Sequence, residues 1–185
     1  MDPRIARTRK SLQNALFDLA RERALDDISI ADIAEQAGVN RSTFYQHYSD
    51  KDTLLADAID AVVEAAGTAI PAVSEISPEP PEVLVDYLRH VDDNAAVYAR
   101  IFGKHGSPVV VARLRDRIQT IVIDAVTTSH AETFGDIPSD VLAAGLSGSV
   151  LGVLEAWVTR DPRPPVETAV RWLWQVLLGP SAVER

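Results

Sequence analysis

Cysteine is absent from the 185-residue chain, which excludes a disulfide framework and thiolate chemistry. There is also no uncharged apolar run of about 18 residues, the length that spans a bilayer. The first ten residues carry four basic side chains and no apolar stretch, unlike a secretory signal peptide. We therefore expect no membrane association and predict a cytoplasmic protein.

The patterns typical of enzymes and metal sites are missing as well. The histidines are scattered along the chain, and none forms a metal-binding pair with another histidine or a carboxylate: His47, His90, His105 and His130. No P-loop, G-x-S-x-G motif or dinucleotide fingerprint occurs. We expect no catalytic residues, no metal and no cofactor. A helical enzyme with His105 as a base is the least favoured alternative.

Negative charge exceeds positive charge, with a formal net charge of −9 at pH 7. Residues 1–51 hold eight Lys or Arg and eight Asp or Glu, so subtraction from the totals of 18 and 27 leaves 10 and 19 for the remainder. The acidic excess therefore lies outside the first segment. That segment opens with a basic arm formed by Arg4, Arg7, Arg9 and Lys10. Such an arm suits a nucleic-acid partner, and it also fits the solvated face of a helix.

Apolar residues are spaced as in helices through most of the chain, and no stretch alternates convincingly like a strand. An opening helix is expected from about residue 4 to 23, and a fourth after Ser49, with Asp52 completing a capping box. Four prolines within 71–81 interrupt the helical pattern. The other expected helices lie near 30–36, 41–47, 82–91, 93–103, 107–130, 139–159 and 165–178. The predicted fold class is all-α.

The most informative stretch lies between residues 29 and 51. Gly38 follows the small residue Ala34 by four positions, where a turn needs positive φ. Asn40 can cap the next helix, and Phe44 then returns to the core. A small residue, a glycine and an apolar residue at these offsets are typical of a helix-turn-helix.

The same spacing predicts which side chains of the second helix face outward. With Val39 and Phe44 facing inward, we expect Arg41, Ser42 and Tyr45 on the outer face. An exposed arginine at the start of a short helix suits the major groove of DNA, where it can bind a guanine edge with two hydrogen bonds. The alternative that this pattern leaves open is a two-helix hairpin inside a helical core.

The sequence IADIAEQAGVNRSTFYQHYSDKDTLL resembles the DNA-binding domain of TetR/AcrR transcriptional regulators. The likeness covers residues 4–62 and includes AGV, STFY, the aromatic Tyr48, and a lysine before Leu-Leu. It implies a three-helix helix-turn-helix DNA-binding domain over residues 1–51, with the start of the fourth helix to about 62. A larger helical domain for ligand binding and dimerisation would follow over residues 63–185.

The resemblance further implies a ligand-responsive repressor. It would bind a palindromic operator in double-stranded DNA as a homodimer and be released by a small-molecule effector. A DNA-binding protein without a ligand is the alternative. By position, the DNA contacts would be Arg41, Ser42 and Thr43 to bases, and Tyr45, His47, Ser29 and Lys51 to phosphates. Asp50 and Ala31 depart from the family pattern, which places more weight on Arg41.

Beyond residue 63 the resemblance says little. The helix at 139–159 carries an apolar face with a glycine stripe beside it: Leu142, Leu146, Val150, Val153, Leu154 and Trp157, then Gly145, Gly148 and Gly152. With the apolar last helix it suggests a four-helix dimer interface, the alternative being intramolecular core. Candidates to line an effector pocket, although residues of this kind are more often plain core, are Tyr87, Tyr98, Phe102, His105 and Trp157.

Overall fold

The computed structural model describes residues 3–67, 79–103, 106–128 and 136–178. Every α-helix in these ranges lies where the apolar spacing predicts one, and the all-α fold class is confirmed. The helices are α1 (Pro3–Glu22), α2 (Ile30–Gln36), α3 (Arg41–His47), α4 (Lys51–Gly67), α5 (Glu82–Asp93), α6 (Ala95–Phe102), α7 (Pro108–Thr128), α8 (Ser139–Val158) and α9 (Val166–Leu178), with a 3₁₀ turn η1 (Leu25–Asp27) after α1. Most of the proline-rich stretch predicted over 71–81 lies outside the described residues.

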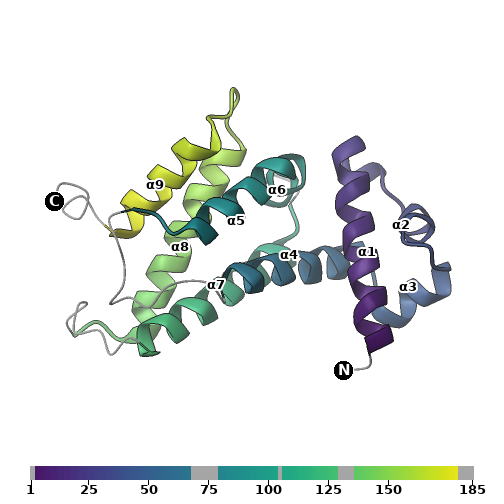
Figure 1. Ribbon diagram of the computed structural model, residues 1–185, viewed down its shortest axis with the longest axis horizontal. Coiled ribbons are helices and arrows are strands. Elements are labelled where there is room, and N and C mark those ends of the chain that lie inside the picture. The colour runs from purple at the N-terminus through teal and green to yellow at the C-terminus, as the bar shows by residue number, and fades with distance from the viewer. Residues whose placement is uncertain (1–2, 68–78, 104–105, 129–135, 179–185) are drawn as a thin grey trace.

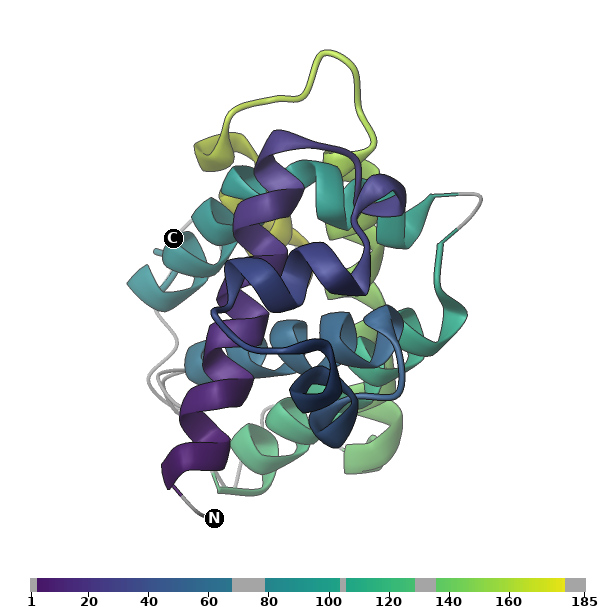
Figure 2. The same cartoon turned by 90° about the vertical axis from the view of Figure 1, so that its right-hand side faces the viewer.

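The helices form a small end and a larger body joined by α4. Figure 1 shows α1, α2 and α3 at one end, α5 to α9 at the other, and α4 running from α1 toward the larger group. In Figure 2, which looks onto the small end, α2 and α3 lie in front of α4 and beside α1. The small end therefore presents α3 away from the rest of the molecule.

α4 packs against both parts. Its Asp57 pairs with Arg9 of α1, whereas its Asp60 pairs with Arg113 of α7. One turn further along α4, Glu64 pairs with a second arginine of α7 at 2.8 Å. A change in the angle of α4 would therefore alter its contacts with α1 on one side and with α7 on the other.

α8 is the most apolar long helix among the described residues. An 18-residue window of it has a mean hydropathy of 1.7, yet only 33% of that window is buried. By length and composition it could cross a membrane, although core helices of soluble proteins meet the same criteria. Exposed apolar surface of this kind is typical of interaction sites.

The apolar face predicted for a dimer interface overlaps only partly with the exposed side of α8, because two of its six residues, Leu154 and Trp157, are buried inside the chain. The residues that face the core are Ala143, Ser147, Leu151, Leu154, Trp157 and Val158, while Leu142, Leu146, Val150 and Val153 are only half-buried at its edge. Because α8 is apolar nearly all round, its spacing could not indicate which side packs inward. Gly145, Gly148 and Gly152 lie on the exposed side, where an added Cβ would meet no atom within 4 Å.

Candidate nucleic-acid interface

A glycine turn fixes α3 relative to α2. Gly38 has φ of +68°, and its N–H donates to Glu35 O at 3.0 Å while Val39 N–H donates to Ala34 O at 2.9 Å. This pair of bonds is the Schellman motif, which closes a helix with a residue in the left-handed region. A side chain at position 38 would strain this conformation, so the predicted role of the glycine is confirmed.

Polar caps hold the first turns of both helices. Ser29 and Asp32 form a reciprocal capping box at the start of α2, and the hydrogen bonds from Ser29 hold the pKa of Asp32 below its ordinary value. At the start of α3, Asn40 Oδ1 accepts from the Thr43 N–H at 2.8 Å. The Ser29 hydroxyl is thus engaged in the cap, while the residue itself is exposed.

α3 has one buried side and one exposed side. Phe44 is 0% exposed and anchors the helix in the core, whereas Arg41, Ser42 and Tyr45 are exposed, as the spacing predicts. Arg41 Nη2 donates to the Tyr45 hydroxyl at 3.3 Å, and its guanidinium carbon lies 5.7 Å from the centre of that ring. The tyrosine thus supports an outward-facing arginine.

The hydroxyl groups at the start of α3 share one acceptor. Asn40 Oδ1 accepts from Ser42 Oγ at 2.6 Å and from Thr43 Oγ1 at 2.9 Å. Both hydroxyl protons therefore point back toward the cap. In this arrangement Ser42 and Thr43 can accept hydrogen bonds from an approaching molecule through their free lone pairs.

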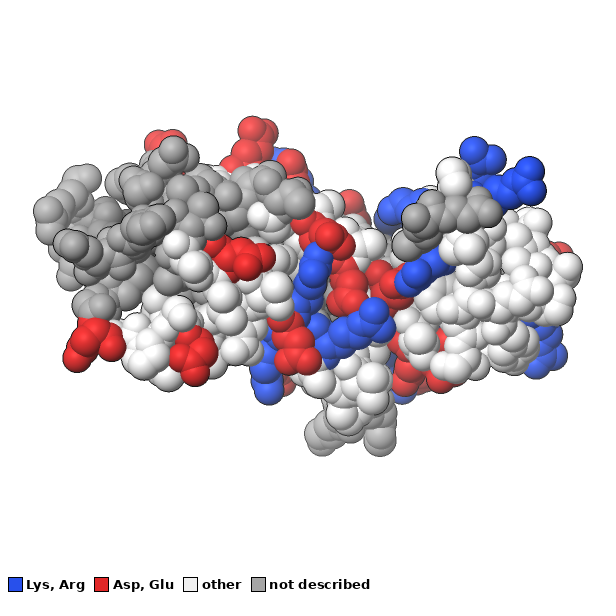
Figure 3. Space-filling view, turned by 90° about the horizontal axis from the view of Figure 1, so that it is seen from below, with Lys and Arg blue, Asp and Glu red and all other residues white. Residues whose placement is uncertain are grey.

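An open hollow of about 510 Å³ lies between the start of α1 and the end of α3. It brings Thr43 and His47 together with five α1 or α3 side chains that the sequence pattern did not assign to contacts: Arg4, Ile5, Thr8, Arg9 and Gln46. The basic arm was the only sign of this hollow in the sequence. In Figure 3, Lys and Arg side chains stand out from the right-hand end, which carries α1 to α3, and Asp and Glu are commoner toward the left.

Lys51 has a structural role that the sequence did not suggest. Its ammonium donates to the carbonyl oxygens of Leu25 and Ile28, the latter at 2.9 Å. α4 is capped by Asp50, whose Oδ1 accepts from Thr53 N–H at 2.7 Å, and not by the predicted Ser49. Either residue can cap a helix. With Asp50 in that place, Lys51 is the first helical residue and reaches back over η1.

Lys51→Met is expected to lower the free energy of unfolding by about 1–2 kcal/mol, because two carbonyl groups lose a charged donor. Methionine keeps most of the aliphatic stem, so the loss reports on the ammonium. Urea unfolding of both proteins measures the difference. Unchanged stability, together with a salt dependence of DNA binding reduced by about one unit, would assign Lys51 to a phosphate alone.

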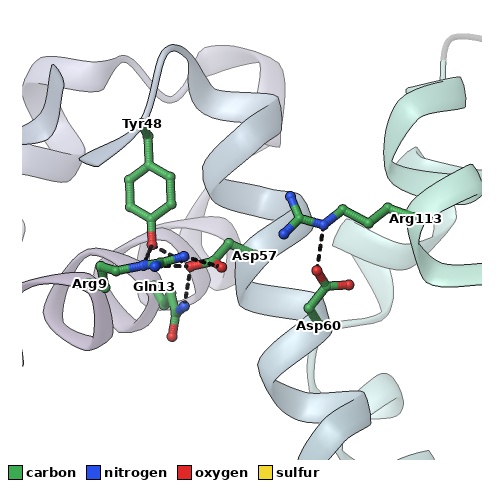
Figure 4. A network of polar contacts seen from close by, with 6 residues as sticks. All are labelled: Arg9, Gln13, Tyr48, Asp57, Asp60 and Arg113. Atoms are coloured by element: carbon green, nitrogen blue, oxygen red, sulfur yellow. Dashed lines mark hydrogen bonds and ion pairs between the residues drawn. The ribbon is translucent and has the colours of Figure 1, made fainter. Parts of the chain in front are cut away.

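A polar network lies behind the helix-turn-helix and joins α1 to α4 (Figure 4). Asp57 accepts hydrogen bonds from Arg9, from Gln13 Nε2 at 2.7 Å and from the Tyr48 hydroxyl. Burial acts to raise the pKa of Asp57, but these three donors and the charge of Arg9 outweigh it and lower that pKa. Burial and Asp57 raise the pKa of Tyr48 to about 12. The carboxylate and the phenol therefore keep opposite hydrogen-bonding roles at neutral pH.

The predicted effector-pocket residues are mostly dispersed. Tyr87 and Tyr98 are buried together on α5 and α6. Phe102 lines a separate hollow of about 250 Å³ beside α7. Trp157 is fully buried and donates its indole N–H to Pro164 O at 2.8 Å, which accounts for it without a ligand. His105 lies outside the described residues.

Two family models match the chain. "Bacterial regulatory proteins, tetR family" matches residues 14–58, and "Transcriptional regulator C-terminal region", a TetR C-terminal model, matches residues 79–176. The first includes α2, α3 and the start of α4. The second takes in more than half of the chain, from α5 to most of α9.

Individual proteins to which the chain is similar are also transcriptional regulators. The uncharacterized HTH-type transcriptional regulator YxbF of Bacillus subtilis (strain 168) is 26% identical over 96% of this chain, which spans 46% of that protein's length. A TetR transcriptional regulator from Streptococcus agalactiae 2603V has a TM-score of 0.59 at 26% identity, covering 95% of this chain and 96% of that one. The TetR-family repressor FadR of Thermus thermophilus, solved with lauroyl-CoA, has a TM-score of 0.59 at 17% identity, covering 92% and 93%.

Proposed function

The chain belongs to the TetR family of bacterial transcriptional regulators, and on this premise we propose that it represses transcription by binding a palindromic operator as a homodimer. The observation that carries this proposal is the geometry of α3. Its buried Phe44 and the Gly38 turn hold Arg41, Ser42 and Tyr45 on an exposed face. A short, polar, rigidly placed helix of this kind suits the major groove.

Within that interface some side chains contact bases and others contact phosphates. Arg41 reads a base edge, and Ser42 and Thr43 accept from exocyclic amino groups through their outward lone pairs. Tyr45, His47 and the Ser29 end of α2 bind phosphates, which position the helix without reading sequence. Lys51 retains one N–H beyond its two carbonyl acceptors for a phosphate. The polar hollow beside His47 is suited to the sugar-phosphate backbone.

Dimerisation is supported by the exposed side of α8. Its exposed residues are apolar or small over most of the helix: Val141, Ala144, Gly145, Gly148, Gly152 and Ala156. On α9, which packs against α8, Val176 is 51% exposed. Small residues let a second backbone approach closely, so α8 and α9 pack against their symmetry mates in a four-helix interface. Two copies then read two half-sites, since a single helix-turn-helix buries too little surface for tight binding.

The larger helical body is proposed to bind a small-molecule effector that releases DNA. The solved complex of Thermus thermophilus FadR, a repressor that shares this fold, with lauroyl-CoA supports a small-molecule effector. Family members are regulators and not enzymes. We place the protein in the cytoplasm, where operator DNA lies. By linkage, an effector that weakens DNA binding must itself bind the DNA complex more weakly.

Arg41→Ala is expected to weaken binding to the preferred operator by about 1–3 kcal/mol and to relax base preference at one position in each half-site. Selection from a random duplex library with both proteins, followed by binding isotherms, measures the two effects. Arg41→Lys keeps the charge but not the planar fork, so it should lose preference while keeping most of the salt dependence.

The matched control is Arg21→Ala on the last turn of α1, an exposed arginine paired with Asp18 at 3.2 Å. Its operator affinity and base preferences should equal those of the parent protein. If Arg41→Ala keeps the same preferences as well, α3 does not read bases in the proposed orientation.

A further inference from the structure

Four polar atoms of α5 and α6 are buried without a hydrogen-bond partner among the described residues. They are the Tyr87 hydroxyl, His90 Nε2, Asn94 Oδ1 and the Tyr98 hydroxyl. Tyr87, Asn94 and Tyr98 are only 8%, 2% and 0% exposed. Buried polar groups are nearly always paired, so a cluster of four unpaired atoms needs a specific cause.

The cluster is uncharged and offers mainly donors. Burial raises the pKa of Tyr87 and of Tyr98 and lowers that of His90, an effect that nearby Arg21 reinforces. Asn94 Nδ2 lies 3.5 Å from His90 Nδ1. This contact favours the tautomer with its proton on Nε2. The two hydroxyl groups also act on each other's pKa, although they do not meet the geometry of a hydrogen bond. Together with one ring N–H they can donate to a ligand, and Asn94 Oδ1 can accept.

The charged side chains that act on the pKa of His90 are Arg21, Asp93 and Lys10, and all three are exposed at the surface. Among the described residues the buried polar side chains are Gln13, Asn94 and Ser147, and none of them is ionised. An ionised group placed here would lose its hydration without gaining a buried opposite charge. A neutral oxygen would instead accept hydrogen bonds from groups that otherwise have none.

The cluster also touches the DNA-binding end of the molecule. The His90 ring meets Phe17 of α1 edge to face, with ring centroids 5.2 Å apart. On another side the same ring meets Tyr98 of α6 at 6.0 Å. His90 is only partly buried, so it is the member nearest to solvent. A molecule entering beside His90 would therefore displace a contact that α1 makes.

We propose that Tyr87, His90, Asn94 and Tyr98 bind the polar group of a small, uncharged effector, a molecule with an apolar body and a hydroxyl or carbonyl oxygen. This assignment rests on the proposed function as a ligand-responsive regulator. The ligand oxygen accepts from the tyrosine hydroxyls, and a ligand hydroxyl donates to Asn94 Oδ1. Ligand binding breaks the contact between His90 and Phe17, and the loss of this contact changes how α1 is held.

The test uses three probes of similar size with the full chain: p-cresol, toluene and 4-methylbenzoate. Calorimetry or chemical-shift titration should show p-cresol binding roughly tenfold or more tightly than the other two, as expected for one or two added hydrogen bonds. Tyr87→Phe/Tyr98→Phe should weaken p-cresol binding by a similar factor. The melting temperature of that variant should stay the same or rise, because the lost hydroxyls have no internal partner.

Equal affinity for the three probes, or no binding of p-cresol at millimolar concentration, would overturn the assignment. So would unchanged p-cresol affinity in the double variant or in both single variants. A fall in melting temperature would show that the hydroxyls have hydrogen-bond partners inside the protein, and it would also overturn the assignment. All these measurements are made without DNA. A chain that binds no operator would refute the proposed function and leave the probe result standing.

Discussion

Gly148→Arg is expected to leave the chain folded but monomeric, and to weaken its binding to a palindromic operator by about a hundredfold or more. Gly148 lies on the exposed side of α8, where an added Cβ meets no atom within 4 Å. The monomer therefore accommodates the side chain, and leaving glycine even favours the helix by about 0.5–1 kcal/mol. A second α8 could no longer approach closely. Sedimentation and operator binding measure the two effects.

Ala112→Arg provides the matched control. Ala112 is an exposed residue of α7, outside the proposed interface, and the substitution adds the same charge. This variant should remain dimeric and bind the operator as the parent does. If Gly148→Arg also sediments as a dimer, α8 does not form the interface, and the exposed small residues of that helix have another explanation.

Asp57→Ala is expected to lower the free energy of unfolding at neutral pH by about 2–4 kcal/mol. The carboxylate accepts from Arg9, Gln13 and Tyr48, and its removal leaves all three donors without their acceptor. The side chain of Arg9 is 34% exposed and that of Asp57 13%. Water can partly replace the lost partner for the arginine, which places the effect below that of a fully buried pair.

The same network predicts an acid-sensitive contribution to stability. The folded-state pKa of Asp57 is lowered, so its stabilisation is present above the unfolded-state pKa, about 3.9, and is lost as the pH falls through the folded value. The stability of Asp57→Ala should therefore depend less on pH below about pH 4. Urea unfolding at a series of pH values measures this difference.

Asp18→Ala is the control for this prediction, because its i,i+3 pair with Arg21 is exposed on both sides. Its stability should change by no more than about 0.5 kcal/mol. If Asp57→Ala is equally mild, or if its acid dependence matches that of the parent, the network does not hold α1 against α4.

The sequence predicted best what depends on neighbouring residues. Gly38, Asn40 and Phe44 act through turns, caps and faces whose offsets are set by one or two helical turns, so their roles follow from local spacing alone. The pairing of Arg9 with Asp57 does not follow from spacing, because 48 positions separate the two residues. In the sequence, Arg9 stands out only as part of a basic arm.

Lys51 and α8 show two other reasons for failure. Ser49 and Asp50 are both good caps, and the choice between them decides whether Lys51 reaches toward η1 or outward. On α8 apolar residues occur on every side, so the hydrophobic pattern could not separate the intramolecular face from the exposed one. Both features depend on packing between distant segments, which local propensity does not contain.

Hydroxyl-radical footprinting of the full chain on its selected operator tests most directly whether two α3 helices of a homodimer read one site. We predict protection with two-fold symmetry, in two half-sites whose centres lie roughly 34–36 Å, one turn of DNA, or a multiple of it, apart. Protection of a single, asymmetric stretch by one copy of the chain would contradict the proposed mode of binding.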